Sequence, residues 1–398
     1  MSVERVGVVG AGTMGAGIAQ IAALGGYETS LHDPIPEALA KGIERMREAL
    51  DRGAERGRWS AEEAQSAAGR IQEAPNLADL SGSDLVVEAA PEDLELKRKL
   101  FGALAEACGP DAILASNTSS LRIGDIAAET PNRERVVGMH FFNPPERMKL
   151  VEVVATEDSS SKALEATAEV GERMGRTPIH AKDTPGFIAN RLARPFSLES
   201  LRMLADGVAD APTIDRIVRL GGGFRMGPFE LIDLIGLDVN LSVARSFYAQ
   251  GGEPARWRPS RIQERLVGEG HLGRKSGRGF YRYDGERHRD PDPELRLRAP
   301  TLDRDELAKI DPTAPRVLPR LVAQIANEAA FALEEEVGSA DDLNTAMRLG
   351  FNWPLGPLEF TELIGTGPAV ALLEELREQR GDAYRPAPRL AAAVESGS

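Results

Sequence analysis

The sequence predicts an α/β domain built on a doubly wound parallel sheet, followed by two homologous all-α domains. Three observations predict this fold class. Short apolar runs alternate with helix-like stretches from residue 5 to about residue 183, as in a parallel sheet with crossover helices. The pattern then becomes helical from Pro185 to about Gly236. Finally, residues 190–236 resemble residues 319–365, which indicates an internal duplication.

Six short apolar runs are the expected strands of the first domain, which should span residues 1–183. Residues 36–73 are rich in Ala, Glu and Arg and predict a helical hairpin inserted between the second and third of these strands. The expected strands are Val6–Val9, Thr29–His32, Leu85–Glu88, Ile113–Ser116, Val136–Met139 and Leu150–Val154.

The duplication defines the rest of the chain. A shift of about 129 positions aligns the two segments without a gap, with about 15 of some 47 positions identical, including Glu199 with Glu328. Repeated helical units usually pack against each other. We therefore expect a first helical domain at residues 184–283 and a second at 313–398. The stretch 284–312, dense in Asp, Glu, Arg and Pro, is expected to be a linker.

Composition excludes several classes of protein. The net charge of −14 argues against a general binder of nucleic acid or of membrane surfaces. The single cysteine, Cys108, allows no disulfide within the chain, and there is no CxxC or HExxH pattern for a metal. No apolar run has the length of a membrane span, and no secretory signal is recognisable. We expect a cytoplasmic protein with no bound metal.

A glycine-rich turn follows the first strand directly. Gly10, Gly12 and Gly15 allow a tight turn and a close approach of the pyrophosphate of a dinucleotide to the start of a helix, where Thr13 and Met14 lie. Asp33 ends the next strand, about 20 residues on. A carboxylate there accepts hydrogen bonds from the ribose and repels the 2′-phosphate of NADP. The sequence therefore predicts a Rossmann-type domain that binds NAD.

Five further motifs occur in order, and together they resemble the 3-hydroxyacyl-CoA dehydrogenase family. They cover the chain up to about residue 283. The motifs are Ser-Asn-Thr-Ser-Ser-Leu at 116–121, Gly-Met-His-Phe-Phe-Asn-Pro at 138–144, Asp-Thr-Pro-Gly-Phe-Ile-Ala-Asn-Arg at 183–191, Gly-Pro-Phe-Glu-Leu-Ile-Asp at 227–233, and Gly-Arg-Lys-Ser-Gly-Arg-Gly-Phe-Tyr at 273–281.

This resemblance implies a catalytic base, His140, with Glu152 as its partner. It also implies that Ser119 and Asn190 surround the reacting oxygen. The chemistry of alcohol oxidation agrees, because histidine titrates near neutral pH and a carboxylate on its far nitrogen fixes the tautomer. Ser116 or Ser120 could take the part of Ser119.

The resemblance further places Glu92 and Lys97 near the cofactor. Each of the predicted catalytic and cofactor residues also has an ordinary structural interpretation. Ser119 could cap a helix, and Lys97 could belong to a solvated helix face.

The implied activity is NAD-dependent, reversible oxidation of an L-3-hydroxyacyl-CoA to a 3-oxoacyl-CoA. One alternative is a dehydrogenase of a free hydroxy acid or sugar acid on the same scaffold, and another is a non-catalytic NAD-binding relative. The serine-rich motif and the arginines of the hairpin favour an acyl-CoA substrate. The sequence sets neither the acyl chain length nor the metabolic direction.

The second repeat departs from the family pattern. Pro319 stands in the position of Asn190, and no His-Glu pair accompanies it. We expect this repeat to be non-catalytic and to cover the first repeat as an internal pseudo-dimer, while any further homo-oligomer stays open. The phosphates of CoA need cations. The hairpin offers Lys41 and several arginines, none singled out: Arg45, Arg47, Arg52, Arg56 and Arg58.

Overall fold

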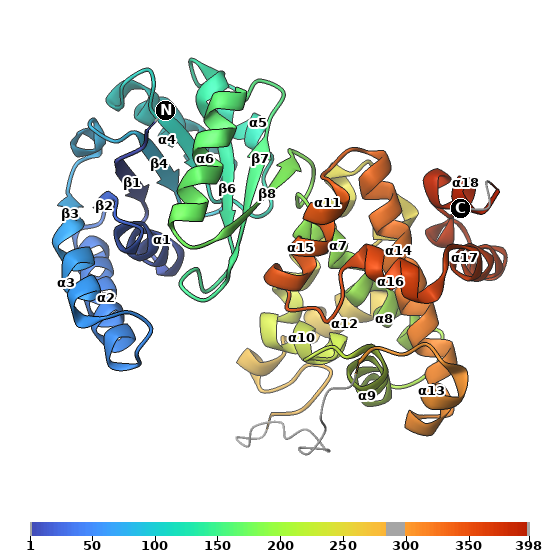
Figure 1. Cartoon of the computed structure of the whole chain (residues 1–398). Helices are drawn as coiled ribbons and strands as arrows, with labels where there is room; N and C mark the ends of the chain where they lie inside the picture. Colours follow the sequence, from blue (N-terminus) through green and yellow to red (C-terminus); the bar gives the residue numbers. More distant parts are fainter. Residues whose placement is uncertain (1, 284–298, 396–398) are drawn as a thin grey trace. The chain divides into compact units, whose positions relative to one another are not determined.

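The computed structural model describes residues 2–283 and 299–395. Its contacts divide the chain into two compact units, Met1–Phe187 and Ile188–Ser398, and each unit is described here by itself. Figure 1 shows a sheet flanked by helices in the first unit and helices alone in the second. The predicted fold class, an α/β domain followed by all-α structure, is confirmed.

An eight-stranded sheet occupies the centre of the first unit, in the order β3-β2-β1-β4-β5-β6-β7-β8. All six expected strands are present, and two further strands, β3 and β8, form its edges. The strands are β1 (Arg5–Val9), β2 (Glu28–His32), β3 (Ile71–Ala74), β4 (Leu85–Glu88), β5 (Ile113–Ser116), β6 (Val136–Phe141), β7 (Leu150–Ala155) and β8 (Thr177–Lys182). The strand order reverses at β1, between β2 and β4, which is where α/β sheets bind their ligands.

The sheet is parallel, as expected, except at the pairing of β6 with β7. β6 and β7 pair antiparallel, whereas all other neighbouring strands pair in parallel. Only residues 142–149 join β6 to β7, and a parallel crossover needs about a dozen residues or more. The chain therefore turns back, and His140 on β6 comes to lie directly opposite Glu152 on β7.

The two unexpected strands carry weak sequence signals. In β3 only the two end residues are buried, so its four residues show no apolar run. β8 contains Pro178, which sheets tolerate mainly on edge strands because proline has no N–H to donate. Both strands lie at edges of the sheet. Pairing with one neighbouring strand stabilises each of them, although its own sequence predicts a strand poorly.

Four helices share one hydrophobic core with the sheet: α1 (Thr13–Leu24), α2 (Pro36–Glu55), α3 (Ala61–Arg70) and α6 (Ser161–Arg173). The hairpin expected at residues 36–73 is α2 and α3, with β3 at its end. Trp59 at its tip donates from Nε1 to the Leu50 carbonyl at 2.8 Å, and Ser60 caps α3 in a capping box with Glu63. The remaining α-helices of this unit are α4 (Leu94–Ala107) and α5 (Ile123–Ala127), and its 3-10 helices are η1 (Leu77–Leu80) and η2 (Arg133–Arg135).

The second unit consists of two corresponding sets of helices. The first set comprises α7 (Ala189–Leu192), α8 (Arg194–Ala205), α9 (Ala211–Gly222), α10 (Pro228–Ile235), α11 (Leu237–Gln250), the 3-10 helix η3 (Ala255–Trp257) and α12 (Arg261–Gly268). The second set comprises α14 (Ala314–Glu334), α15 (Ala340–Gly350), α16 (Pro357–Ile364), α17 (Thr366–Arg380), the 3-10 helix η5 (Asp382–Tyr384) and α18 (Pro388–Glu395). The continuous helix α14 takes the place of α7 and α8.

The two repeats contact each other reciprocally, through equivalent residues. Arg191 Nε of the first repeat lies 2.8 Å from Glu328 Oε1 of the second, and both side chains are buried. Arg320, the equivalent of Arg191, pairs with Glu199, the equivalent of Glu328. When two residues contact each other and their two equivalents contact each other in the same way, the interface has two-fold symmetry. The expected internal pseudo-dimer therefore has a structural counterpart within one chain.

Backbone conformation repeats as well. Gly207 and its equivalent Glu336 both have positive φ, at 66° and 55°, and so do Gly223 and its equivalent Asn352, at 72° and 52°. Left-handed backbone favours glycine, because a Cβ atom crowds the neighbouring carbonyl. The second repeat keeps these turns even where the glycine has been replaced.

The expected linker, residues 284–312, falls only partly within the described residues. Residues 284–298 lie outside them, and the remainder contains the helix α13 (Arg304–Ile310). Asp303 caps this helix, and Leu307 is fully buried. A single buried leucine does not produce apolar periodicity, which is why the sequence alone favours a linker here.

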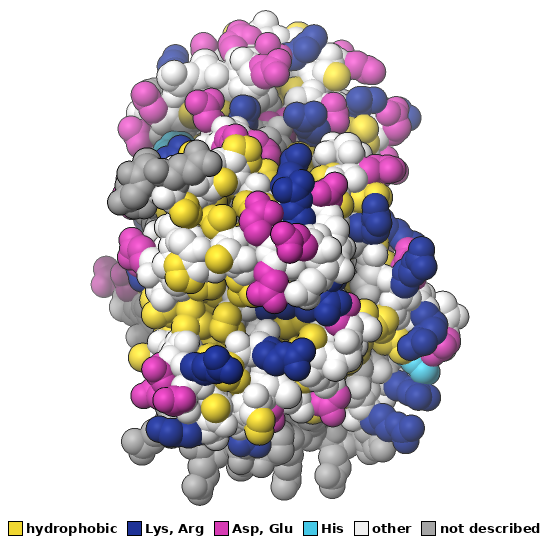
Figure 2. Space-filling view, turned by 90° about the vertical axis from the view of Figure 1, so that its right-hand side faces the viewer, with side chains coloured by type: hydrophobic (Ala, Val, Ile, Leu, Met, Phe, Trp, Pro, Cys, Tyr) yellow, Lys and Arg dark blue, Asp and Glu magenta, His cyan; other side chains and the backbone are white. Residues whose placement is uncertain are grey.

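Two absences hold for residues 2–283 and 299–395. No helix there is long and apolar enough to cross a membrane, and no three His, Cys, Asp or Glu side chains gather as ligands for a metal ion. On the face in Figure 2, basic and acidic side chains are interspersed, with hydrophobic side chains bare between them. The net charge of −14 thus does not give this face a single sign.

Candidate active site

The glycine turn between β1 and α1 leaves room for a ligand. Gly10 has a φ of 100°, and a Cβ atom there would lie 2.6 Å from the Ala89 carbonyl oxygen. Gly12 precedes the first turn of α1, and a Cβ atom there would meet nothing within 4 Å. Packing therefore requires glycine at the first position, whereas the space over Gly12 is open.

Asp33 joins this turn to the end of β2. Its Oδ2 accepts a hydrogen bond from the Ala11 N–H, and its Oδ1 accepts one from the Ile35 N–H, both at 2.9 Å. A carboxylate oxygen has two acceptor positions, so each can still accept a ribose hydroxyl.

The turn fits a dinucleotide. No side chain caps the start of α1, where Thr13 and Met14 lie, and its first turn holds no acidic residue. The N–H groups and the helix dipole there suit a pyrophosphate. The open space over Gly12 and the placement of Asp33 agree with this ligand.

His140 and Glu152 form a buried pair on neighbouring strands. His140 Nδ1 lies 2.6 Å from Glu152 Oε2, and the two residues are 5% and 0% exposed. The antiparallel register places them opposite each other, with no loop involved. The rings of Phe142 and Phe187 lie 4.7 and 5.8 Å from the imidazole centroid. Because Glu152 occupies Nδ1, Nε2 is the nitrogen left for chemistry.

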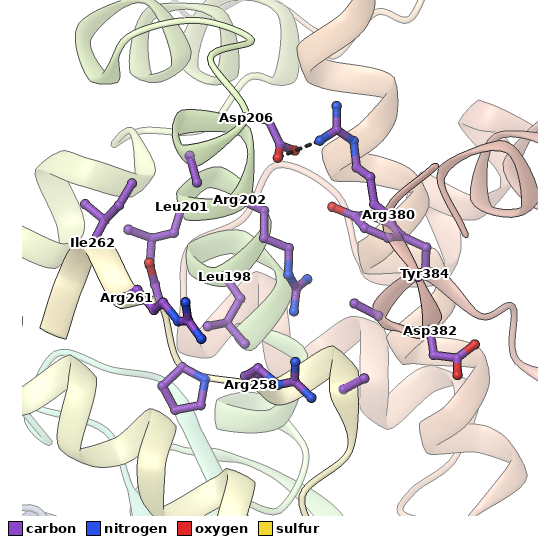
Figure 3. Close-up of a pocket in the computed structure, with 16 residues that line it drawn as sticks. Leu198, Leu201, Arg202, Asp206, Arg258, Arg261, Ile262, Arg380, Asp382 and Tyr384 are labelled. Atoms are coloured by element: carbon purple, nitrogen blue, oxygen red, sulfur yellow. Dashed lines mark ion pairs between the residues drawn. The ribbon is translucent and has the colours of Figure 1, made fainter. Parts of the chain in front are cut away.

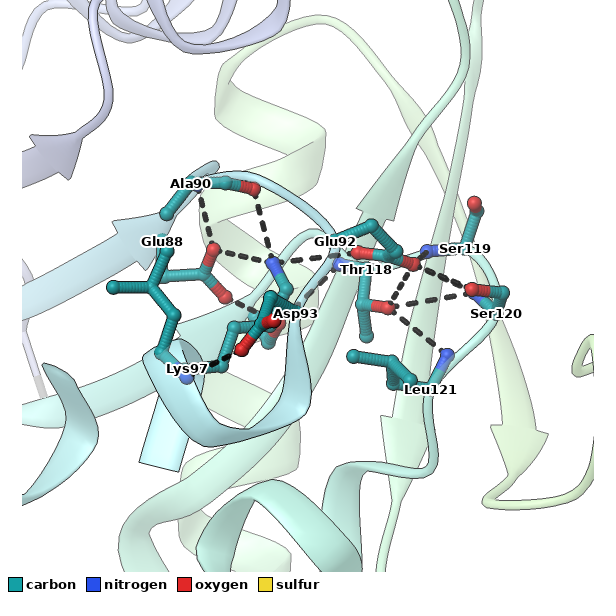
Figure 4. A network of polar contacts seen from close by, with 11 residues as sticks. Glu88, Ala90, Glu92, Asp93, Lys97, Thr118, Ser119, Ser120 and Leu121 are labelled. Atoms are coloured by element: carbon teal, nitrogen blue, oxygen red, sulfur yellow. Dashed lines mark hydrogen bonds and ion pairs between the residues drawn. The ribbon is translucent and has the colours of Figure 1, made fainter. Parts of the chain in front are cut away.

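A second buried network lies at the carboxyl ends of β4 and β5 (Figure 4). Glu88 is fully buried, and the Lys97 ammonium lies 2.5 Å from its Oε1. The Ser116 hydroxyl donates to Glu88 Oε2 at 2.6 Å, and the Ala90 N–H donates to Oε1 at 2.6 Å. Lys97 is itself 1% exposed. It therefore neutralises a buried carboxylate and does not belong to a solvated helix face.

Glu92 extends this network to the serine-rich motif. Its Oε1 accepts from the hydroxyls of Thr118 and Ser120 at 2.6 and 2.7 Å and from the Ser119 N–H at 3.2 Å, and Lys97 lies 3.4 Å from its Oε2. Burial opposes ionisation, but the hydrogen bonds from Thr118 and Ser120 and the charge of Lys97 prevail and hold the pKa of Glu92 below its usual value. A charged Glu92 thus fixes the loop that carries Ser119.

The predicted site residues fall in both units. The first unit holds the glycine turn, Asp33, the network of Glu92 and Lys97, Ser119, and the pair of His140 and Glu152. Asn190 lies in the second unit, in α7, where its carbonyl accepts from Arg194 Nε at 3.2 Å.

Two polar residues of the site were missed from the sequence. Glu88 ends β4 as a buried carboxylate, and ligand sites lie at the carboxyl ends of such strands. Asn117 follows β5, and its Oδ1 accepts from the Phe141 N–H at 2.8 Å, next to His140. The signal for both was present, because a polar residue directly after an apolar strand marks this edge of the sheet.

The two glycine-rich motifs of the second unit meet in a structural clamp. Asp233 accepts from the N–H groups of Phe280 and Tyr281 at 2.9 and 3.0 Å and from the Tyr283 hydroxyl at 2.9 Å. Asp215 accepts from the Tyr281 hydroxyl at 2.6 Å and from the Phe229 N–H at 2.9 Å. Burial raises the pKa of Asp215 to about 7. These carboxylates hold the loop at residues 273–283 against α10.

Comparison with known proteins identifies the family. A family model described as 3-hydroxyacyl-CoA dehydrogenase, NAD binding domain, matches residues 5–184. The C-terminal domain of the same enzyme has a model that matches residues 186–283 and also residues 317–398. The helical domain is therefore present twice, as the sequence predicts.

Individual relatives agree over the whole chain. The 3-hydroxyadipyl-CoA dehydrogenase of Escherichia coli K12 is 37% identical over 470 residues, covering 100% of this chain and 99% of the relative. A crystal structure of 3-hydroxybutyryl-CoA dehydrogenase from Escherichia coli K12 has a TM-score of 0.89 at 36% identity and covers 100% of both chains.

A shorter relative lacks part of the chain. A probable 3-hydroxybutyryl-CoA dehydrogenase of Bacillus subtilis is 40% identical over 284 residues, which cover 71% of this chain and 99% of the relative. This coverage fits a relative with one copy of the helical domain. The matched family models span most of the chain, and the glycine turn fits their cofactor. The chain thus belongs to the 3-hydroxyacyl-CoA dehydrogenase family and is an NAD-dependent oxidoreductase.

Proposed function

We propose that this protein oxidises an L-3-hydroxyacyl-CoA to the 3-oxoacyl-CoA, reversibly, with His140 as the general base. The observation that carries the proposal is the buried contact of 2.6 Å between His140 Nδ1 and Glu152 Oε2. The names of the relatives support the substrate class, since all those compared act on 3-hydroxyacyl thioesters of CoA.

The pair determines which nitrogen acts. An ionised carboxylate only accepts hydrogen bonds, so Nδ1 must carry the proton that it shares with Glu152. Nε2 then has a free lone pair that takes the proton of the 3-hydroxyl group. The imidazolium that forms is stabilised by Glu152, which is fully buried and therefore little screened by water. In the reverse reaction the same Nε2 returns the proton.

A bound NAD cofactor would supply the acceptor for the hydride from C3 of the substrate. Gly12, the first turn of α1 and Asp33 would hold its pyrophosphate and ribose. The network of Glu88, Lys97 and Glu92 keeps the loop of Ser119 in place beside β4 and β5.

We assign the polar contacts to the reacting oxygen to Ser119 and Asn190. Ser116 and Ser120, the other candidates, direct their hydroxyls to Glu88 and Glu92, which supports Ser119. A hydroxyl and an amide can hydrogen-bond the substrate oxygen as its charge changes. The arginines of the α2–α3 hairpin are the proposed cations for the phosphates of CoA.

The decisive assay is NADH formation with L-3-hydroxybutyryl-CoA, 3-hydroxyadipyl-CoA and a longer L-3-hydroxyacyl-CoA. In His140→Ala we expect kcat to fall by about 10²-fold or more, with NAD affinity unchanged, because general base catalysis contributes about 10²–10⁴-fold. His271→Ala is the matched control, since His271 lies in the second unit beside Glu269. Turnover of free 3-hydroxy acids but of no thioester would point to the free-acid dehydrogenase, and NAD binding without any turnover to a non-catalytic relative.

A further inference from the structure

A pocket of about 620 Å³ lies inside the second unit, between the two helical repeats (Figure 3). Its walls come from three segments: α8 with Asp206, residues 255–262, and residues 380–384. None of these residues belongs to the proposed active site. The volume lies within the range of about 300–1,000 Å³ that is typical of small-molecule sites.

The pseudo-symmetry of the two repeats is broken at one side chain that lines the pocket. Trp257 and Tyr384 occupy equivalent places, since each ends a one-turn 3-10 helix and donates to the buried glutamate of the other repeat. The residue before Trp257 is Arg256. The residue before Tyr384 is Ala383, which lines the pocket.

On the side of the first repeat, Arg256 fills the space. Its guanidinium lies 3.0 Å from Glu328 and 3.5 Å from Glu335, and its Cζ lies 4.2 Å from the ring centroid of Phe331. On the other side, Ala383 cannot reach the equivalent carboxylates, Glu199 and Asp206. On this side Arg202 and Arg380 pair with those carboxylates instead, and the pocket lies open beside them.

The open side is rich in positive charge. Arg202, Arg258, Arg261 and Arg380 all line it (Figure 3). Of these, Arg202 donates to Glu199 at 3.1 Å and Arg380 lies 2.5 Å from Asp206.

The two carboxylates of the pocket are already engaged. Asp206 also accepts from Arg320, and Asp382 pairs with Arg377 Nε at 3.2 Å. Arg258 and Arg261 are exposed and form no ion pair with any carboxylate in the described part of the chain. Two guanidinium groups are thus available to an anion.

The floor of the pocket is apolar. Ala205, Pro259 and Ile262 line it, are at least partly exposed and present aliphatic surface, whereas Leu198 and Leu201 are themselves buried. A cationic rim over an aliphatic floor matches a ligand with an anionic head and an apolar body. Guanidinium groups bind carboxylates through paired hydrogen bonds.

We propose that this pocket binds a small amphipathic organic carboxylate of the fatty-acid type. Its carboxylate lies on Arg258 and Arg261, and its aliphatic part lies on Ala205, Pro259 and Ile262. The site is separate from the proposed catalytic residues and does not depend on the proposed function.

Titration calorimetry of the full chain with octanoate tests this site. The sharpest variant is Ala383→Arg, which places in the pocket the guanidinium that Arg256 provides on the other side. We expect octanoate binding to be lost in this variant while Tm is maintained. The exposed double variant Arg258→Ala, Arg261→Ala should bind at least about tenfold more weakly, because each charge-assisted hydrogen bond contributes about that factor.

A matched control and two further probes complete the experiment. Arg265→Ala removes an exposed arginine of the same helix, α12, that lies beside Glu269, and it should bind like the wild type. Octanol has the apolar chain without the negative charge, and inorganic phosphate has the negative charge without the chain. Both should therefore bind more weakly than octanoate. The proposal is overturned if the wild type does not bind octanoate, if Ala383→Arg binds it equally well, or if phosphate alone binds as tightly.

Discussion

At the scale of single residues, the site depends on buried charges that are paired. Glu152 and Glu88 are each fully buried, and a nitrogen-bearing side chain, His140 or Lys97, lies 2.6 or 2.5 Å from the carboxylate. Removing the partner of a buried charge costs far more than the pair contributes, since the remaining charge cannot be solvated. The two pairs differ in purpose, because the proposed function has one act on the substrate, whereas the other holds the loop of the serine-rich motif.

Glu152→Gln tests the first pair. Glutamine keeps the shape of the side chain but cannot stabilise an imidazolium by charge and does not enforce one tautomer. We expect kcat to fall by up to about 10⁴-fold, as for the equivalent change in a serine-protease triad. Steady-state kinetics with NAD binding as a second readout checks this. A variant with unchanged kcat would remove Glu152 from the mechanism.

Lys97→Met tests the second pair. The change leaves Glu88 buried without its cation, so we expect the amino-terminal unit to lose about 3–5 kcal/mol of unfolding free energy. Urea denaturation followed by far-UV circular dichroism measures this loss. Lys99→Met, an exposed lysine on the same helix, is the control and should cost less than about 0.5 kcal/mol. Equal effects of the two variants would contradict a special role for Lys97.

The sequence predicts these residues unevenly. His140 and Glu152 stand in recognisable motifs, and a strand pairing brings them together. A glutamate at the end of an apolar strand marks the ligand-binding edge of the sheet, but the sequence does not show that the Glu88 side chain is buried there. Lys97 was placed near the cofactor from resemblance alone, whereas its burial and its bond to Glu88 follow from tertiary packing.

At the scale of elements, the strands with continuous apolar runs were predictable, and the edge strands were not. β7 was expected as a strand, but its reversed direction follows from the short connection 142–149. The reversal matters for function, since it brings Glu152 opposite His140. The clamp of the loop 273–283 also escapes sequence reasoning, because Asp215 lies 66 residues before the Tyr281 that it binds.

The buried Asp215 of the clamp makes the folding stability of the protein depend on pH. Burial raises the pKa of Asp215 to about 7, above the value of about 3.8 expected in the unfolded chain. Between these values the folded state binds more protons than the unfolded state, so stability contributed by this group falls as pH rises from about 4 through 7. We expect Asp215→Asn to flatten the decline of Tm between pH 5 and pH 8.

The second repeat supplies a control for this prediction. Asn344 is the equivalent of Asp215, and its Oδ1 accepts from the Leu358 N–H at 3.0 Å. It is only partly buried. Asn344→Asp should therefore introduce a smaller pH dependence than Asp215→Asn removes. Differential scanning calorimetry measures Tm across the pH series. Parallel curves of Tm against pH for Asp215→Asn and the wild type would contradict a raised pKa for Asp215.

At the scale of the whole molecule, the duplication was predictable from the sequence, and its packing was not. Identity between the repeats identifies Glu199 with Glu328, but does not show that each pairs with an arginine of the other repeat. The rings of Phe224 and its equivalent Trp353 also meet, with centroids 5.3 Å apart. Equivalent residues that touch lie near a two-fold axis.

Deleting residues 313–398 tests the role of the second repeat. The truncated chain would expose Arg191 and Glu199 together with the apolar surface around Phe224, so we expect aggregation or a dimer whose population rises with concentration. Sedimentation velocity over a concentration series measures this, with the full chain as the reference. A truncated chain that stays monomeric and stable would show that the second repeat does not cover the first.

The contrast between Arg256 and Ala383 has a genetic meaning. In a dimer of identical subunits one gene encodes both sides of the axis, so every substitution occurs twice and each gain or loss is doubled. In this chain the two sides are encoded separately, and one can mutate while the other is kept. When the two halves lie in one chain, a substitution on one side of the interface is not repeated on the other. A recess can therefore form on one side alone.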